Sequence, residues 1–294
     1  MAPVVVKGCA VGLIDTLICP DTPHRPLSLR HLKYKNRKLI GDFRFGSMSL
    51  ERGYFKLIND KRVLGLIPAR GGSKRLPRKN LLDLNGKPLI VWTIESALNS
   101  KLLDDVIVST DDLEISSMAS LHGIKVPFIR PADLARDDTP SIDVVLHAID
   151  EMKTGYGLEY DYICLLEPTS PIRKNSDIDA MIAKLESKAA DFDGIISVGE
   201  ALLHPSIMQK VDDDNLRHLF PQFPITTIRQ EYEAVHVPFG VAYICKTDTL
   251  ISEKTFYPTR LTHYTVERYQ YFEVDDYVDL LCIEAVLRML GKDN

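Results

Sequence analysis

The chain has 294 residues, of which 45% are hydrophobic and 26% are charged, and its formal net charge is -5. This balance is typical of a globular protein with one large domain and a sizeable core. The mild acidity argues against general nucleic-acid binding, since domains with that function are usually basic. No apolar run approaches the roughly 20 residues that span a bilayer, and the N-terminus lacks the layout of a signal peptide. We therefore expect no membrane partner.

The cysteines indicate in which cellular compartment the protein functions. There are five of them, and no C-x-x-C pair occurs, so the sequence indicates neither a disulfide framework nor a zinc site. Cys164 and Cys245 lie in apolar runs typical of strands, which favours small core side chains over nucleophiles. We expect a cytoplasmic protein, because unpaired cysteines fit a reducing compartment.

Residues 1–47 differ from the rest of the chain. Prolines interrupt this segment repeatedly, and residues 30–38 are strongly basic. Met48 then stands shortly before the first predicted strand. We predict that Met48 is the natural start or that residues 1–47 are an N-terminal extension without a catalytic role, and that residues 48–294 form one catalytic domain. N-terminal sequencing of the native protein tests this. A mature chain that starts at Met1 and loses activity on truncation to Met48 would contradict it.

The first predicted strand, residues 63–67, is a short apolar run that ends at Pro68. The loop that follows contains two adjacent glycines, Gly71 and Gly72, whose amides can approach a ligand closely because they lack a Cβ. The same loop carries five cations, Arg70, Lys74, Arg75, Arg78 and Lys79. Backbone donors combined with arginine forks and lysine charges indicate a polyphosphate site.

This loop differs from two better-known phosphate-binding loops. It contains neither the G-x-x-x-x-G-K-[ST] pattern of P-loops nor the G-x-G-x-x-G pattern of dinucleotide-binding loops. A plain basic cluster, solvated or bound to nucleic acid, is the remaining alternative. The position directly after a buried strand, together with the glycine pair, favours a phosphate loop.

Downstream, apolar strand-like runs alternate with helical patterns. The run 162–166 is continuously apolar, as expected in a sheet that is covered on both faces. The alternation predicts an α/β fold with a largely parallel sheet and right-handed crossovers. Glu167 and Pro168 directly follow the run 162–166. Ligands of open α/β sheets collect at such carboxyl ends of strands.

Asp111 and the pair Glu273 and Asp275 each have more than one interpretation. Asp111, after the predicted strand 106–109, can begin a capping box with Glu114 or contribute to a nucleotide site. Glu273 and Asp275 stand two residues apart, so in a strand they would point to the same side and suit Mg²⁺. The alternative is that Asp275 or Asp276 caps the C-terminal helix. We favour the metal, because pairing carboxylates on one strand face without a cation is costly.

The loop after the first predicted strand, residues 69–80, resembles the signature of the acylneuraminate cytidylyltransferases, also called CMP-sialic acid synthetases. The signature is close to A-R-x-x-S-K-x-x-P-x-K-N, and the matching residues are Ala69, Arg70, Ser73, Lys74, Pro77, Lys79 and Asn80. Residues 109–112 resemble a second block of this family, and residues 165–173 resemble its L-L-Q-P-T-S-P-L-R block. Residues 239–244 resemble an N-G-A-I-Y-I block, and residues 273–275 resemble a D-I-D motif. The resemblance covers about residues 62–291.

The resemblance implies a Rossmann-like, three-layer α/β/α nucleotidyltransferase fold of GT-A-like type. A small dimerisation excursion at about 200–240 would contribute to the neighbouring sugar site of a homodimer. The implied reaction transfers CMP from CTP to the anomeric hydroxyl of a nine-carbon 2-keto-3-deoxy sugar acid of the N-acetylneuraminate type, with release of pyrophosphate. The alternatives are the same reaction on legionaminic acid or another nonulosonate, and a non-catalytic nucleotide-binding relative. A nucleic-acid-binding protein is a third alternative, and salt-sensitive binding to DNA or RNA would identify it.

The resemblance also implies residue roles. Arg70 and Lys79 would be the catalytic cations at the triphosphate. The implied nucleotide-binding residues are Ala69, Gly71, Gly72, Ser73, Asn80, Asp111, Glu167 and Pro168. The implied sugar-binding residues are Arg229, Gln230, Phe239 and Gly240. Glu273 and Asp275 would bind Mg²⁺ or Mn²⁺.

The sequence departs from the family pattern at four positions, one of them next to Arg229 and Gln230, which resemble part of an R-R-Q block. Glu167 stands where the family usually has Gln, and Glu273 stands where it has Asp. Ile228 replaces an Arg, and Phe239 replaces an Asn, so apolar area replaces polar contacts there. Glu167 can accept a hydrogen bond from the cytosine amino group. It cannot donate one at neutral pH, and its charge would oppose a nearby triphosphate.

Overall fold

The structure is a computed structural model that describes residues 60–223 and 233–291. The chain divides into two units, residues 1–51 and 52–294, and every described residue belongs to the second unit. The predicted extension, residues 1–47, lies outside the described residues. So do the predicted sugar-binding residues Arg229 and Gln230 and the departure at Ile228.

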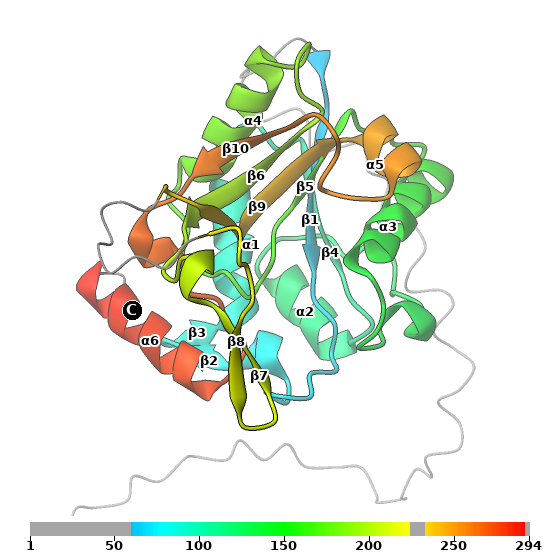
Figure 1. The fold of residues 1–294 in the computed structure, drawn as a ribbon. Helices are drawn as coiled ribbons and strands as arrows, with labels where there is room; N and C mark the ends of the chain where they lie inside the picture. Colours follow the sequence, from blue (N-terminus) through cyan, green and yellow to red (C-terminus); the bar gives the residue numbers. More distant parts are fainter. Residues whose placement is uncertain (1–59, 224–232, 292–294) are drawn as a thin grey trace, which may run out of the picture. The chain divides into compact units, whose positions relative to one another are not determined.

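The second unit is built on a six-stranded sheet in the order β10-β6-β9-β5-β1-β4 (Figure 1). In chain order the strands are β1 (Val63–Pro68), β4 (Asp105–Ser109), β5 (Tyr162–Leu165), β6 (Gly194–Glu200), β9 (His236–Lys246) and β10 (Leu261–Thr265). Neighbouring strands pair in parallel except at β9, which runs antiparallel to both β5 and β6. The prediction of a largely parallel α/β sheet is confirmed.

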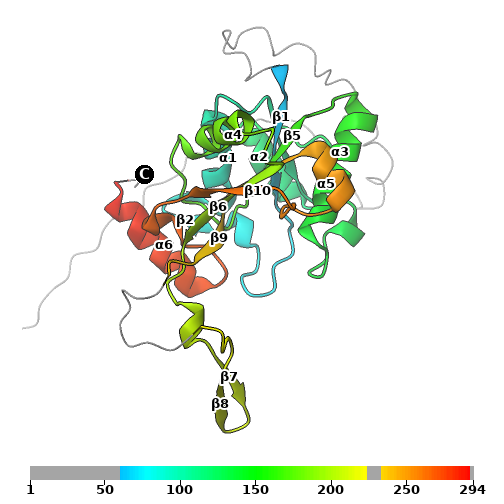
Figure 2. The same cartoon turned by 45° about the horizontal axis from the view of Figure 1, so that its top comes forward.

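Helices cover both faces of this sheet (Figure 2). They are α1 (Leu89–Asn99), α2 (Leu113–Leu121), α3 (Ser141–Tyr156), α4 (Asp177–Ser187), α5 (Thr247–Glu253) and α6 (Tyr277–Met289). Helices α1, α2 and α4 share one apolar cluster with Val63 and Ile67 of β1. Leu64 and Leu66 point to the other face, because side chains alternate along a strand. On that face α3 packs against β1 and also contacts α5. None of the described helices is long and apolar enough to cross a bilayer.

Helix α6 forms a second, smaller core with residues near α1. Its Leu280, Ile283 and Leu287 pack in one cluster with Leu89 and Trp92 of α1. The short elements are η2 (Lys79–Leu81), β2 (Asp83–Leu84), β3 (Lys87–Pro88), η3 (Ala132–Leu134), η4 (Pro205–Ile207) and η6 (Arg268–Gln270). The second, smaller core connects the segment before α6 with the loop after β1. Both segments contribute to the site described below.

A hairpin of β7 (Gln209–Asp212) and β8 (Asn215–His218) forms a separate two-stranded sheet, which we call the arm. It projects away from the central sheet (Figure 2). It falls within the excursion predicted at about 200–240. Val211 and Leu216 of the arm are 68% and 71% exposed, so the arm presents large apolar side chains to solvent. Such exposure is unusual for a surface that has no partner.

Candidate nucleotide site

Three loops meet at one edge of the sheet because β5, β1 and β4 are parallel neighbours. The loop after β1 starts at Ala69, whose N–H donates to the Ser109 carbonyl at the end of β4 at 2.9 Å. Asp111 follows β4, and Glu167 follows β5. The carboxyl ends of parallel strands are the usual place for ligands in open α/β sheets. The fold therefore brings these predicted site residues to one edge.

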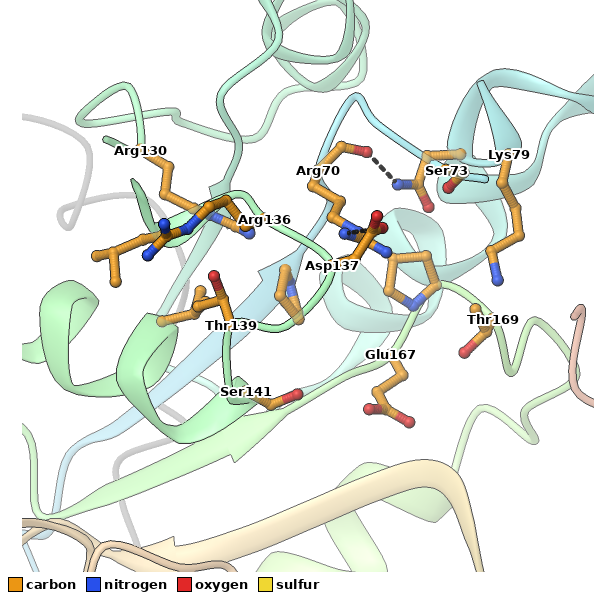
Figure 3. A pocket seen from close by; sticks show the side chains of 15 residues that line it. Arg70, Ser73, Lys79, Arg130, Arg136, Asp137, Thr139, Ser141, Glu167 and Thr169 are labelled. Carbon is orange, nitrogen blue, oxygen red and sulfur yellow. Dashed lines mark hydrogen bonds and ion pairs between the residues drawn. The ribbon is translucent and has the colours of Figure 1, made fainter. Parts of the chain in front are cut away.

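A cavity of about 290 Å³ lies at this edge (Figure 3). The predicted site residues that line it are Arg70, Ser73, Lys79, Asn80, Glu167 and Pro168. Sequence reasoning missed six further polar residues in its wall, which are Arg130, Arg136, Asp137, Thr139, Ser141 and Thr169. Four of the lining side chains are cationic and two are acidic, so the wall suits an anionic ligand that bears several phosphate oxygens.

The shape of the loop after β1 is fixed by contacts to its neighbours. The Gly71 N–H donates to Asp111 Oδ1 at 2.9 Å, and Asn80 Nδ2 donates to the Arg70 carbonyl at 3.0 Å. A Cβ on Gly71 would lie 2.6 Å from Asp112 Oδ2, so only glycine fits without a shift. At Gly72 a Cβ would meet nothing within 4 Å. The close approach to the loop after β4 thus explains the first glycine of the pair but not the second.

The interpretation of Asp111 as a helix cap is wrong. Asp112 caps α2, since its Oδ1 accepts from the N–H groups of Glu114 and Ile115 at 2.8 and 3.0 Å. Adjacent aspartates offer two capping choices, and the sequence does not rank them. Asp111 is already bonded to the Gly71 amide, so it holds the phosphate loop in place.

The five cations of the loop do not act together. Arg70 and Lys79 line the cavity. Arg78 faces α2 instead, where its guanidinium donates to Glu114 Oε2 at 2.5 Å and to Asp112 Oδ2 at 3.3 Å. Arg78 therefore anchors the loop, while Arg70 and Lys79 present positive charge to the cavity.

Arg130 supplies a buried positive charge to the cavity wall. Its side chain is 5% exposed, and it donates through Nε to Ser109 Oγ at 3.1 Å and through Nη2 to the Ser109 carbonyl. Burial lowers the pKa of Arg130 to about 10, opposed by the nearby Asp111 carboxylate, so the guanidinium stays charged at neutral pH. A single Arg-Pro step after an irregular segment carries no pattern that sequence reasoning could have used.

Opposite the phosphate loop, β9 bulges away from β6 at residues 239–242. The register shifts between Ile196 and Val198, so this part of β9 leaves the regular ladder. Ser197 Oγ satisfies two of the freed backbone groups, since it donates to the Phe239 carbonyl and accepts from the Ala242 N–H. Phe239 stacks on Tyr271 with ring centroids 4.4 Å apart. Bulges are common next to active sites, where they redirect side chains.

Two ionisable side chains, Glu273 and Arg173, form hydrogen bonds with further backbone groups of the bulge. Glu273 Oε1 accepts from the Gly240 N–H at 2.5 Å and from Ser170 Oγ at 2.8 Å. The Arg173 guanidinium, which is 2% exposed, donates to the carbonyls of Gly240 and Val241 and also to that of Glu167. Arg173 therefore joins the end of β5 to the bulge. Ser170 and Arg173, which sequence reasoning gave no role, hold this part of the site together.

Glu167 is placed between the two sides of the site. It lines the cavity, and a Cβ on Gly240 would lie 2.4 Å from its Oε2 and 3.0 Å from Glu273 Oε1. Burial raises the pKa of Glu167 to about 7, and the Glu273 carboxylate adds to this rise. Two of the family departures, far apart in sequence, thus meet beside Gly240.

The strand geometry predicted for Glu273 and Asp275 is wrong, because residues 271–276 form no strand. Val274 lies buried between the two acids, and its N–H donates to the Thr169 carbonyl at 2.7 Å while its carbonyl accepts from Lys79 Nζ at 2.7 Å. These bonds turn the backbone so that Glu273 faces the bulge. Asp275 lies toward Lys79, with Oδ1 to Nζ at 3.6 Å.

The alternative prediction, that Asp275 or Asp276 caps the C-terminal helix, is confirmed for Asp276. Asp276 Oδ1 accepts from the N–H groups of Val278 and Asp279 at 2.8 and 3.1 Å, so Asp276 caps α6. Asp275 is 68% exposed and its carboxylate caps nothing. This leaves the Asp275 carboxylate accessible beside the cavity-lining Lys79.

The acidic residues fit a metal ion only in part. The described residues contain no group of three or more His, Cys, Asp or Glu side chains that could hold one. Glu273 keeps one oxygen outside its bonds to Gly240 and Ser170, and Asp275 is exposed. Mg²⁺ is often held by one or two carboxylates together with substrate phosphates and water. This donor set therefore fits an ion shared with a phosphate ligand, not a closed protein site.

A parallel sheet with a cation-lined cavity at the carboxyl ends of three neighbouring strands defines a nucleotide-binding α/β protein. The solved structure of a CMP-2-keto-3-deoxy-manno-octonic acid synthetase in complex with CTP has the same fold. Its TM-score is 0.58 at 19% sequence identity, over 78% of this chain and 100% of that one. The cytidylyltransferase family model matches residues 64–282, so the chain belongs to the cytidylyltransferase family. The family and the fold class predicted from the sequence are both confirmed.

Two relatives narrow the comparison. A pseudaminic acid cytidylyltransferase from Campylobacter jejuni is 48% identical over 115 residues, which are 39% of this chain and 49% of that enzyme. The chain thus spans about half the length of that relative. A CMP-N,N'-diacetyllegionaminic acid synthase from Legionella pneumophila is 35% identical over 203 residues, 68% of this chain and 85% of that enzyme.

Proposed function

We propose that the protein transfers CMP from CTP to the anomeric hydroxyl of a nine-carbon 2-keto-3-deoxy sugar acid of the N-acetylneuraminate type, releasing pyrophosphate. The observation that carries the proposal is the cavity at the ends of β1, β4 and β5, with Arg70, Lys79 and Arg130 in its wall. The alternative is the same reaction on legionaminic acid or another nonulosonate, supported by the names of the Legionella and Campylobacter relatives.

In this reaction the sugar hydroxyl attacks the α-phosphorus, and the bond from that phosphorus to the bridging oxygen of pyrophosphate breaks. No protein nucleophile is needed, so the protein acts by positioning and by stabilising charge. Arg70 and Lys79 would hold the triphosphate and offset the charge on the departing pyrophosphate. The loop amides at Gly71 and Gly72, with Ser73 and Asn80, would add neutral hydrogen bonds or hold the loop.

A divalent cation, Mg²⁺ or Mn²⁺, would neutralise charge on the phosphate oxygens. Asp275 and the second oxygen of Glu273 would hold it. Lys79 lies 3.6 Å from Asp275 and bonds to the Val274 carbonyl, so it connects this acidic segment with the phosphate loop. Asp111 would act through Gly71, whose amide it fixes.

The sugar would lie on the side of the bulge, near Phe239 and Gly240. A second copy of the chain would complete that side, as the exposed Val211 and Leu216 of the arm are suited to bury against a partner. A homodimer in the cytoplasm is therefore part of the proposal. The three cysteines within the described residues, Cys164, Cys245 and Cys282, are all free thiols, as in proteins of a reducing compartment.

The test is pyrophosphate release with CTP and Mg²⁺ against N-acetylneuraminate, legionaminate, pseudaminate and Kdo. Release with N-acetylneuraminate well above the others supports the main proposal, and release mainly with legionaminate or pseudaminate supports the alternative. Measurable CTP binding without release for any sugar would contradict the proposed reaction. Size-exclusion chromatography with light scattering tests the dimer, and a monomer at micromolar concentration would contradict it.

A further inference from the structure

Asp137 neutralises two cations of the phosphate loop. Its Oδ1 lies 2.6 Å from Arg70 Nη1, and its Oδ2 lies 2.6 Å from Lys74 Nζ (Figure 3 shows the Arg70 contact). One carboxylate thus bridges two side chains from opposite sides. This is also how a phosphate group is bound between an arginine and a lysine.

The segment that carries Asp137 is attached loosely to the rest of the fold. It runs from Pro131 to Pro140, between Arg130 and the start of α3, and it forms one wall of the cavity. Among the described residues, its backbone hydrogen bonds outside regular helices all stay within residues 131–143. The Thr139 hydroxyl also bonds inside the segment, to the Asp133 carbonyl at 3.1 Å. The ion pairs of Asp137 are therefore its main polar tie to the phosphate loop.

The electrostatics agree with this arrangement. The Lys74 ammonium, helped by the Arg70 guanidinium, lowers the pKa of the Asp137 carboxyl, so Asp137 is ionised at neutral pH. Its side chain is 37% exposed and that of Lys74 is 81% exposed, so water and dissolved anions reach the bridge. An exposed ion pair is weak enough to be exchanged for a more highly charged partner.

We propose that Asp137 is an internal anion that competes with a substrate phosphate for Arg70 and Lys74, and that the segment 131–140 moves off the phosphate loop when a polyphosphate binds. The proposal rests on the proposed function, since it takes the ligand to be a nucleoside triphosphate or pyrophosphate. A triphosphate brings more charge than one carboxylate, so it wins the exchange. The segment then changes its contacts, and nucleotide binding is coupled to the position of Arg136 and Thr139 in the same wall.

The competition sets the apparent affinity. A protein whose binding-competent state is only fractionally populated binds its ligand more weakly by that fraction, so a bridge that is closed about 90% of the time weakens binding roughly tenfold. Removing the carboxylate removes this competition. The Asp137→Asn variant should therefore bind polyphosphates more tightly, which is the opposite of what loss of a binding residue would do.

The experiment is isothermal titration calorimetry of the full chain with inorganic pyrophosphate and, separately, with CTP, in the presence of Mg²⁺. Asp137→Asn should lower the Kd of both ligands roughly five- to tenfold, following the competition above. Asp138→Asn is the matched control. Asp138 is the next residue, is 84% exposed and, within the described part of the chain, pairs only with Arg136 at 3.8 Å, so the same charge is removed without touching the bridge. Its Kd should stay within about twofold of the native value because exposed charges are screened.

A second measurement uses the native protein alone. Hydrogen–deuterium exchange of residues 131–140 should rise when pyrophosphate is added, because the ligand displaces Asp137. An unchanged or slower exchange there would overturn the proposal, as would an Asp137→Asn variant that binds no better than Asp138→Asn. If the native protein binds CTP and releases pyrophosphate but Asp137→Asn gains nothing, only the competition is overturned. If neither protein binds CTP or pyrophosphate, the proposed function falls as well.

Discussion

The two halves of the site differ in how they relate to the family. The phosphate half, residues 69–80 with Asp111, keeps every residue of the signature and presents two of its cations, Arg70 and Lys79, to a cavity. The bulge half, residues 239–242 with Glu167 and Glu273, contains three of the four departures. All three lie around one distorted stretch of β9. Under the proposed function, the phosphate half would bind the triphosphate and the bulge half would lie beside the sugar.

The halves also differ in their physics. Charges in the phosphate half are paired or exposed, as in the Arg70–Asp137 contact at 2.6 Å. In the bulge half, burial raises the pKa of Glu167 to about 7, and the neighbouring Glu273 carboxylate adds to this rise. We expect substitutions in the first half to affect catalysis and those in the second to affect stability and the choice of sugar.

The largest expected effect is in the phosphate half. Lys79→Ala should lower kcat/KM on the order of a hundredfold or more, since comparable electrostatic donors are worth roughly 3 kcal/mol in the barrier. Steady-state pyrophosphate release measures this. Lys153→Ala is the control, because Lys153 lies at the far end of α3 and pairs only with the exposed Glu159 at 2.9 Å. Normal turnover by Lys79→Ala would refute the role of Lys79.

In the bulge half, Glu167→Gln should change the pH dependence of stability. The pKa of Glu167 is raised from 4.5 to about 7 in the folded protein, so the folded state binds more protons than the unfolded state between these values. Native stability therefore falls as pH rises through that window, by at most roughly 3 kcal/mol. The neutral Gln variant lacks this loss, so it should be more stable than the native protein at pH 8 and similar at pH 4.

Urea unfolding at several pH values, with a chelator present, measures the difference. Glu159→Gln, at a residue whose side chain is 71% exposed, is the control and should leave the profile unchanged. A Gln variant with the native pH profile would show that Glu167 is ionised in the folded protein throughout the range.

Gly240→Ala should destabilise the protein by about 2 kcal/mol, because overpacking of a filled site forces neighbouring groups apart. The new Cβ would meet Glu167 Oε2 at 2.4 Å and Ser170 Oγ at 2.5 Å. Gly72→Ala is the matched control in the phosphate half, where the new Cβ meets nothing within 4 Å. The free energy of unfolding decides the comparison. Equal losses in the two variants would mean that the bulge is not tightly packed.

The smallest effect is expected for Ser170→Ala. This variant removes one of the two hydrogen bonds to Glu273 Oε1, the one of 2.8 Å, and hydrogen bonds to charged groups contribute about 1.5–3 kcal/mol. Since the Gly240 N–H still holds Glu273, we expect the loss of stability to lie at the lower end, about 1.5 kcal/mol. The KM for the sugar should rise while the KM for CTP stays constant. A change confined to CTP would place Glu273 in the phosphate half.

Sequence reasoning found the phosphate half because its signal is local. Gly71, Arg70 and Lys79 stand within ten residues of each other directly after an apolar strand. Arg130 and Asp137 reach the same cavity from about 60 residues away, through the pairing of β4 with β1. No short pattern marks them, so tertiary structure alone brings them to the site.

The errors have similar physical causes. At Asp111 and Asp112, two adjacent residues could serve as the cap, and a contact to the distant Gly71 decided between them. At Glu273 and Asp275, an assumed strand was replaced by an irregular segment because Val274 bonds to Thr169 and Lys79 instead of to a neighbouring strand. Both outcomes depend on partners that are remote in sequence.

The reversed direction of β9 has a consequence for how the protein can change. Strands β5 and β6 end where β9 begins, so Phe239 and Gly240 enter the site at the start of their strand while the rest of β9 leads away from it. The arm is inserted just before that point, between β6 and β9. Its length and sequence can therefore vary without shifting the register of any other strand. Under the proposed function, one insertion would then carry changes in both sugar choice and subunit contact, while the loop after β1 at the neighbouring strands stays as it is.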